Sequence, residues 1–139
     1  MNHQDLEKLA TAKRTTGKAL VLIIEDNLKQ QKLYRLIKDE TGMLPCIVST
    51  CEEGMEAAKF VNFNLIILDL GMPNAGAIEC AKKIQEIERK RGIRTPIITV
   101  TARAMSGDRE KCLDAGMDDY LSKPFSIVEL REKISIWAA

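Results

Sequence analysis

The sequence contains a single histidine, few aromatic residues and no long apolar segment. The histidine, His3, lies in a polar stretch at the start of the chain. This position excludes a Ser-His-Asp or Cys-His catalytic site and a histidine-ligated metal in the folded core. The longest apolar run near the start covers only residues 19–24, which is too short for a membrane span or a signal-peptide core. We therefore expect no membrane contact and a cytoplasmic location.

The sequence also lacks an excess of charge of either sign. It has 21 Lys and Arg against 20 Asp and Glu, a formal net charge of +1, so it offers no electrostatic attraction to nucleic acid or to an anionic membrane. Its 139 residues, 45% hydrophobic and 29% charged, suit one globular domain. We expect a polar leader at residues 1–18, frayed or with a turn or two of helix and little to bury, and one domain over residues 19–139.

Metal and redox motifs built on cysteine are absent as well. Cys46, Cys51, Cys80 and Cys112 form no Cys-x-x-Cys pair, so their spacing fits neither a zinc site nor a redox motif. We expect four buried free thiols.

Strand and helix patterns alternate five times along the chain. The expected strands are residues 19–24, 46–49, 65–68, 97–100 and 119–122, and the expected helices are 28–40, 51–60, 78–90, 107–115 and 126–137. Three of the strands are nearly continuous runs of Ile, Leu and Val, as in strands buried on both faces. This alternation predicts an α/β fold, a doubly wound parallel sheet covered by helices on both faces.

Polar residues follow four of the strands. Glu25 and Asp26 end the first, Asp69 the third and Thr101 the fourth, and Lys123 follows the fifth. In an open parallel sheet these side chains share the carboxyl edge, where such folds bind their ligands. Three carboxylates, a hydroxyl and an ammonium together predict a site for Mg²⁺ and phosphoryl chemistry.

Each residue type suits one role in that chemistry. The Asp69 carboxylate can accept a phosphoryl group covalently, and the Glu25 and Asp26 carboxylates can serve Mg²⁺. Thr101 can bond a phosphate oxygen; Thr99 is equally suitable by type, and only the strand-end position favours Thr101. Lys123 supplies a mobile positive charge. The proline that follows it fixes a turn and is a candidate for a cis peptide.

These residues resemble a known family. The motifs are Glu25-Asp26-Asn27, Asp69-x-x-Met72-Pro73, Thr101-Ala102 and Tyr120-x-x-Lys123-Pro124. Together they resemble the receiver domain of two-component response regulators, and residues 107–125 resemble receivers of hybrid histidine kinases and phosphorelays. The resemblance covers about residues 19–137. It implies a flavodoxin-like (βα)5 fold with strand order 2-1-3-4-5, of which this family is itself a standard example.

The resemblance also implies roles for the site residues. Asp69 would take a phosphoryl group from a phosphohistidine on a histidine kinase or a histidine phosphotransfer protein. Mg²⁺ would be held by Asp26, Asp69 and the backbone carbonyl of Gly71, with Glu25 acting through water. Thr101 and Lys123 would bind the phosphoryl oxygens.

The response to phosphorylation is implied in the same way. Backbone amides near Gly71 and Ala102 would also bind the phosphoryl group, and Thr101 and Tyr120 would move together as a switch. A downstream protein would read the switch on the face formed by residues 107–115, 119–122 and 126–137. The chain would be a signalling domain with autocatalytic phosphotransfer, not a turnover enzyme, and would not contact nucleic acid.

Three features depart from the family pattern. Glu25 stands where aspartate is more common, and the loop after Pro73 is expected to be shorter or differently turned. Gly71, two residues after the acceptor, has no side chain to place a hydrolytic water, and Arg103, two residues after Thr101, is a cation. We expect slow self-dephosphorylation.

The first expected helix, residues 28–40, is the candidate docking site for a partner protein. Its spacing predicts an inward face of Leu33, Leu36 and Ile37 and an outward face of Leu28, Gln31 and Arg35. The outward face is a candidate contact for a phosphotransfer helix bundle.

Two other functions remain open. One is a binding module that is never phosphorylated, against which the complete acidic set argues. The other is an unrelated Mg²⁺-dependent phosphohydrolase, against which the lack of an Asp-x-Asp pair at Asp69 argues. Gly17-Lys18-Ala19 lacks the other residues of a P-loop, so nucleotide binding of that type is excluded.

Overall fold

A single five-stranded parallel sheet organises the chain. The computed structural model describes residues 2–69, 74–101 and 108–138. The sheet order is β2-β1-β3-β4-β5, which confirms the predicted topology. The strands are β1 (Ala19–Glu25), β2 (Met43–Val48), β3 (Leu65–Asp69), β4 (Ile97–Thr101) and β5 (Asp119–Ser122). β2 begins three residues earlier than predicted, directly after Gly42, which ends the preceding helix in the left-handed conformation.

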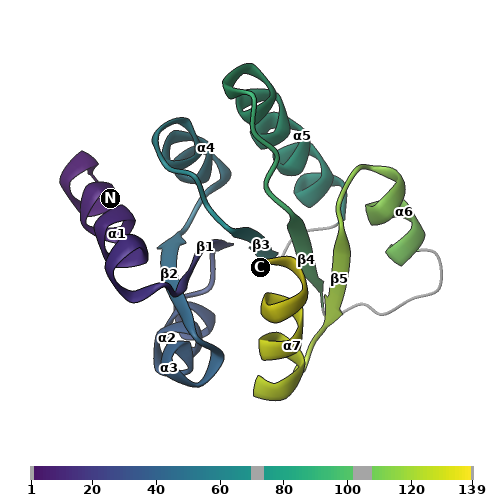
Figure 1. Cartoon of the computed structure of the whole chain (residues 1–139). Helices are drawn as coiled ribbons and strands as arrows, with labels where there is room; N and C mark the ends of the chain where they lie inside the picture. The colour runs from purple at the N-terminus through teal and green to yellow at the C-terminus, as the bar shows by residue number, and fades with distance from the viewer. Residues whose placement is uncertain (1, 70–73, 102–107, 139) are drawn as a thin grey trace.

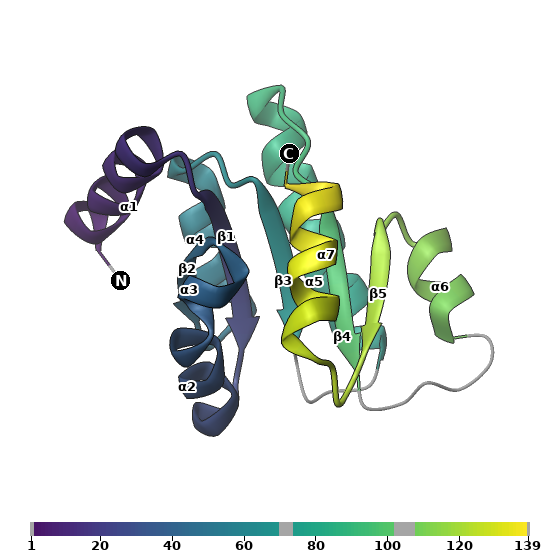
Figure 2. The same ribbon diagram turned by 60° about the horizontal axis from the view of Figure 1, so that its bottom comes forward.

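Helices cover both faces of the sheet (Figures 1 and 2). On one face lie α4 (Cys51–Phe60), α5 (Asn74–Arg91) and α6 (Asp108–Asp114), and on the other lie α2 (Leu28–Leu36), α3 (Lys38–Thr41) and α7 (Ile127–Trp137). The β1 side chains alternate between the two resulting cores: Leu20, Leu22 and Ile24 enter one, and Val21 and Ile23 the other. All five are completely buried, which explains the uninterrupted apolar run in the sequence.

The first residues form a helix of four turns, not a frayed leader. α1 (His3–Thr16) begins with a capping box between Asn2 and Asp5. Leu6 is buried in the core on the α4 side of the sheet, and Lys13 Nζ donates to the carbonyl oxygen of Asn62 at 3.2 Å. The expectation of a frayed segment or of one or two helical turns was therefore wrong, although the helix buries little, with Leu6 as its buried residue.

The buried face of α2 differs from the predicted one. Gln31 and Tyr34 point inward, together with Ile37 at the helix end, whereas Leu33 and Leu36 are exposed. Leu28 and Arg35 are exposed as predicted. Apolar spacing failed because the inward positions lie beneath the polar edge of the sheet, where a glutamine and a tyrosine find hydrogen-bond partners.

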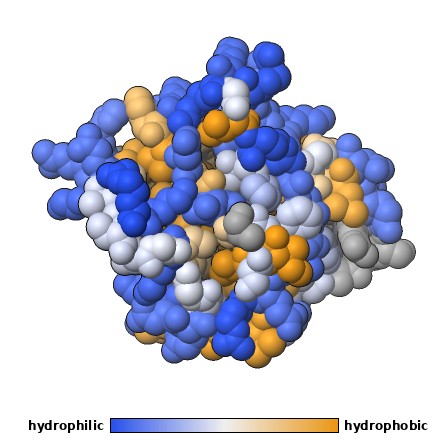
Figure 3. Space-filling model, viewed as in Figure 1, coloured by the Kyte–Doolittle hydropathy of each residue, from blue (hydrophilic) through white to orange (hydrophobic). Residues whose placement is uncertain are grey.

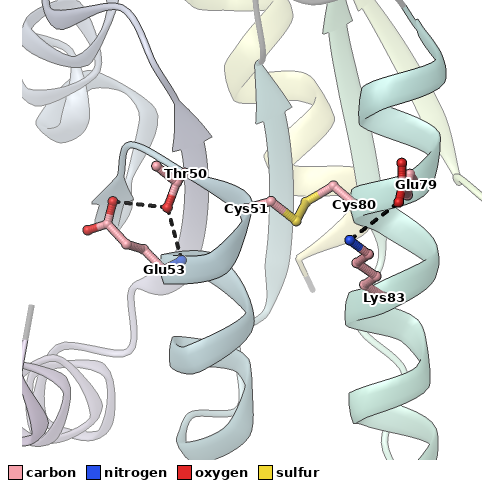
Figure 4. Close-up of a disulfide and its surroundings, with 6 residues drawn as sticks. All are labelled: Thr50, Cys51, Glu53, Glu79, Cys80 and Lys83. Carbon is pink, nitrogen blue, oxygen red and sulfur yellow. Dashed lines mark hydrogen bonds and ion pairs between the residues drawn. A yellow bond between two sulfur atoms is a disulfide. The ribbon is translucent and has the colours of Figure 1, made fainter.

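Two cysteines are joined, contrary to the prediction of four free thiols. Cys51, at the start of α4, and Cys80, in α5, form a disulfide with a Cα–Cα distance of 5.8 Å (Figure 4). The two helices are neighbours on one face of the sheet, a juxtaposition that a separation of 29 residues does not reveal. Cys46 and Cys112 are buried thiols, and burial raises the pKa of Cys46 to about 12.

The described surface is mixed in character. The face in Figure 3 is mostly hydrophilic, with hydrophobic areas separated by polar ones. Within residues 2–69, 74–101 and 108–138, no helix is long and apolar enough to span a bilayer.

Candidate functional site

The strand order brings the predicted site residues to one edge of the sheet. Glu25 and Asp69 are partners in the register of the neighbouring strands β1 and β3. Thr101 ends β4, and its carbonyl oxygen accepts a hydrogen bond from the backbone N–H of Lys123 at 2.8 Å. All four residues therefore lie at the carboxyl ends of adjacent strands. Their chemical roles remain predictions.

Asp69 is almost completely enclosed. It is 1% exposed, although its side chain is ionisable. Lys123 Nζ lies 2.5 Å from Oδ1, and the Tyr34 hydroxyl donates to Oδ2 at 2.9 Å. Oδ1 thus faces a cation whose side chain is 28% exposed, whereas Oδ2 accepts a hydrogen bond from a residue of the protein core.

Glu25 is also buried. Its Oε1 accepts the backbone N–H of Asn27 at 2.8 Å, and its carbonyl oxygen accepts Gln31 Nε2 at 2.6 Å. Burial raises the pKa of Glu25 to about 8, and the neighbouring Asp69 carboxylate adds to the rise. Two carboxylates side by side out of water disfavour a second negative charge, so this pair favours binding of a cation.

Within the described residues, two buried side-chain oxygens are left without a hydrogen bond. They are Oε2 of Glu25 and Oδ1 of Asp69; the latter has the Lys123 ion pair but not the directional geometry of a hydrogen bond. Glu25 Oε2, an orphaned carboxylate oxygen at the sheet edge, is the kind of hard donor that Mg²⁺ prefers. The residues therefore fit the ion, with Asp26 as the exposed carboxylate beside them.

The described part of the chain does not hold three His, Cys, Asp or Glu side chains in a ready-made metal cluster. Mg²⁺ does not require one, since it commonly takes one or two carboxylates and keeps several waters. An open pocket of about 380 Å³, lined by Glu25, Asp26, Asn27, Gln30 and Lys123, provides room for such a hydrated ion.

The switch residues lie on neighbouring strands. Thr101 and Tyr120 are both half-buried, and β4 and β5 are paired with Thr99 opposite Tyr120. The Lys123–Pro124 peptide is cis, as anticipated. Gly71, Ala102 and Arg103 lie outside the described residues, so their predicted roles are not tested by the geometry.

The segment before Tyr120 is fixed to α7. Asp119 Oδ2 accepts Lys133 Nζ at 2.7 Å and Trp137 Nε1 at 2.8 Å. Burial alone would raise the pKa of Asp119, but these two hydrogen bonds lower it below the ordinary value. The carboxylate therefore anchors α7 to β5 as a charged group.

Sequence reasoning missed Tyr34 and placed Gln31 on the outward face of its helix, whereas it is buried. Both contact the site: Tyr34 through Asp69 and Gln31 through the Glu25 carbonyl oxygen and Ser49 Oγ. The sequence signal for them was their spacing: residues three positions apart lie on the same face of a helix, and Tyr34 follows Asp26 by eight residues. Leucines at other positions on the helix concealed it.

Comparisons with known proteins agree with this geometry. The family model described as "Response regulator receiver domain" matches residues 21–135. Hybrid signal transduction histidine kinase I of Dictyostelium discoideum is 36% identical over 123 residues, 83% of this chain and 7% of the relative. The KDP operon transcriptional regulatory protein KdpE of Escherichia coli is 35% identical over 116 residues, 84% of this chain and 49% of the relative. The chain thus spans less than half of these relatives.

Solved structures give the same result. The receiver domain of sensor histidine kinase PA1611 from Pseudomonas aeruginosa, with magnesium in its active-site cleft, is 32% identical with a TM-score of 0.74, covering 87% of this chain and 98% of that one. The receiver domain of Ssk1 from Saccharomyces cerevisiae, solved with the histidine phosphotransfer protein Ypd1, is 31% identical with a TM-score of 0.75, covering 87% and 89%.

Proposed function

Because the chain belongs to the response regulator receiver domain family, we propose that Asp69 accepts a phosphoryl group from a phosphohistidine on a histidine kinase or histidine phosphotransfer protein. The observation that carries this proposal is the buried Asp69 carboxylate at the sheet edge, with Lys123 against one oxygen and Glu25 on the adjoining strand. The domain would be residues 19–139, preceded by α1. It would act as a signalling switch whose chemistry is limited to autocatalytic phosphotransfer and slow self-dephosphorylation.

The transfer is a simple displacement. A carboxylate oxygen of Asp69 attacks phosphorus, the P–N bond of the phosphohistidine breaks, and its electron pair stays on the imidazole nitrogen. Lys123 offsets negative charge on the phosphoryl oxygens, and the Thr101 hydroxyl binds one of them, with backbone amides at Gly71 and Ala102. When bound, Mg²⁺ would neutralise charge on the phosphoryl group; Asp26, Asp69 and the Gly71 carbonyl would hold it, with Glu25 acting through water.

Phosphorylation would be read through Thr101 and Tyr120. The Thr101 hydroxyl would move to the phosphoryl group and the Tyr120 ring would turn inward, which changes the surface of α6, β5 and α7. A downstream protein would bind there. The balanced net charge gives no support to direct binding of nucleic acid.

The phosphotransfer partner would dock on α2, beside the site. Leu28 and Leu36 are 76% and 67% exposed, and Arg35 is exposed between them. Apolar side chains within a basic surface suit a helix bundle that presents a phosphohistidine. A cytoplasmic location stays a prediction, and the Cys51–Cys80 disulfide is an uncommon feature for that compartment.

Slow self-dephosphorylation is a separate part of the proposal. It rests on the sequence, which has glycine at position 71 and a cation at Arg103. The lifetime of the phosphoryl group on the purified protein tests it, and a half-life of seconds would contradict it.

One experiment distinguishes the three functions. The protein is incubated with Mg²⁺ and acetyl phosphate, and intact mass is measured for wild type, Asp69→Asn and the control Asp114→Asn, an exposed aspartate in α6. A labile phosphoryl adduct on wild type and on the control, but not on Asp69→Asn, supports the receiver function. A wild type without an adduct points to a binding module, and steady release of phosphate with no trapped adduct points to a phosphohydrolase.

A further inference from the structure

Tyr34 touches the acceptor carboxylate from the core side. Its hydroxyl lies 2.9 Å from Asp69 Oδ2, and its side chain is completely buried. We propose that Tyr34 is a positioning residue that makes the phosphoryl group on Asp69 easier to remove. This inference rests on the proposed function, since it concerns the same acceptor.

The tyrosine is held so that its hydroxyl has a fixed direction. The ring belongs to the core beneath α2 and α7 and stacks on Phe125, with centroids 6.1 Å apart and an angle of 26° between the planes. A tyrosine hydroxyl ordinarily has a pKa of about 10, well above neutral pH. The hydroxyl therefore keeps its proton and remains a donor.

The two oxygens of Asp69 consequently differ. Oδ2 is engaged by Tyr34, whereas Oδ1 faces the half-buried Lys123 ammonium and has no hydrogen bond. The geometry leaves Oδ1 as the oxygen that attacks phosphorus. In the aspartyl phosphate, Oδ1 becomes the bridging oxygen, and Oδ2 becomes a carbonyl oxygen that still faces the tyrosine.

The hydrogen bond is stronger before phosphorylation than after it. A donor bonded to a carboxylate gains roughly twice as much as one bonded to a neutral carbonyl oxygen. Tyr34 therefore stabilises free Asp69 more than the aspartyl phosphate. The equilibrium with a phosphohistidine shifts away from the aspartate.

The same contact accelerates removal of the group. In hydrolysis, a water oxygen attacks phosphorus, the Oδ1–P bond breaks, and its electron pair returns to the carboxylate; the water proton passes to phosphate or solvent. The departing carboxylate shares its new charge with Oδ2, where the tyrosine hydroxyl stabilises it. Transfer back to an imidazole has the same leaving group and gains in the same way.

Two replacements at position 34 change the donor strength while retaining the ring. Tyr34→Phe removes the hydroxyl, and 3-fluorotyrosine, inserted at this position alone, makes the phenol a stronger donor. Each protein is phosphorylated with acetyl phosphate and Mg²⁺, and the loss of the adduct is followed by intact mass. The equilibrium with a phosphorylated histidine phosphotransfer protein is measured in parallel.

The expected order of hydrolysis rates is 3-fluorotyrosine above tyrosine above phenylalanine, with phenylalanine about fivefold slower than wild type. The equilibrium should shift toward phosphorylated Asp69 by a similar factor in Tyr34→Phe. If Tyr34 served only to support the fold, the 3-fluorotyrosine protein would not hydrolyse its aspartyl phosphate faster than wild type. Equal rates in all three proteins, or faster hydrolysis in Tyr34→Phe, overturn the inference alone. A wild type that takes up no phosphoryl group overturns the proposed function as well.

Discussion

The Lys123 ammonium lies 2.5 Å from Oδ1 of Asp69. Lys123 is itself fixed to the sheet by the hydrogen bond from its backbone N–H to the Thr101 carbonyl oxygen. The cation that faces the Asp69 carboxylate is therefore bonded to the end of the neighbouring strand, β4, which carries the predicted phosphate-binding hydroxyl. Any change in the Asp69 charge acts directly on this part of the fold.

Replacing Lys123 with methionine should lower both stability and phosphorylation. The buried Asp69 carboxylate would lose its cation, which should reduce the free energy of unfolding at neutral pH by about 1–3 kcal/mol. Urea unfolding measures this loss. Asp69→Asn in the same chain should recover part of it, because the uncompensated charge is gone. An equal loss with and without Asp69→Asn would show that the ion pair is not the cause.

Glu25 should make the metal-free protein less stable as the pH rises. Its pKa is about 8 in the folded protein against an ordinary value of 4.5. Between these values the folded state binds a proton that the unfolded state has released, so the free energy of unfolding falls from pH 4.5 to pH 8. Urea titrations across this range should show the decline in wild type and a flatter profile in Glu25→Gln.

Added Mg²⁺ should counteract that decline. The ion binds the carboxylate form, so its stabilising effect should be larger at pH 8 than at pH 6. Glu52→Gln, at an exposed position of α4, is the matched control and should behave as wild type. A stability that is independent of both pH and Mg²⁺ would contradict the coupling of Glu25 to the site.

Asp119 should stabilise the folded protein without taking part in the phosphoryl chemistry. Asp119→Ala leaves the Lys133 ammonium and the Trp137 indole without their shared acceptor, at a cost of about 2–3 kcal/mol. Thermal unfolding tests this against Asp114→Ala, which removes an exposed aspartate and should change little. Similar losses in both variants would count against the anchoring role.

Gly54 should not tolerate alanine. It lies in α4, where alanine normally favours a helix by about 1 kcal/mol. A Cβ at this position would stand 2.9 Å from Cγ1 of Ile24, closer than two carbons can pack. Gly54→Ala should therefore destabilise the protein by about 1–3 kcal/mol, as measured by urea unfolding. Glu56→Ala, on the exposed side of the same helix, should be near neutral.

The parallel sheet could be predicted because buried parallel strands leave a strong pattern, whereas its strand order was implied only by the resemblance to the family. The runs ending at Glu25 and Asp69 are apolar throughout, the run ending at Thr101 is apolar except for Thr99, and each stops at a polar residue. The convergence of these residues follows from topology alone, since adjacent parallel strands end at one edge. The only large error in strand bounds was at β2, where Pro45 and flanking half-buried residues weaken the pattern.

The neighbours of the site could not be predicted in the same way. Apolar spacing identifies a buried face only where the buried residues are apolar, and α2 buries Gln31 and Tyr34 at the polar edge of the sheet. The Cys51–Cys80 contact depends on how two helices pack side by side. Neither spacing nor composition contains that information.

The disulfide has a topological consequence for the acceptor. The chain between Cys51 and Cys80 includes the whole of β3, so Asp69 lies within a closed covalent ring. A single backbone cleavage inside this ring would leave the two fragments joined through the disulfide, with β3 still tethered on one side. In the unfolded chain the ring also removes conformations, which by loop size alone favours the fold by about 3–4 kcal/mol. The strand that carries the proposed phosphoacceptor is thus one that an oxidised chain cannot release by one cut.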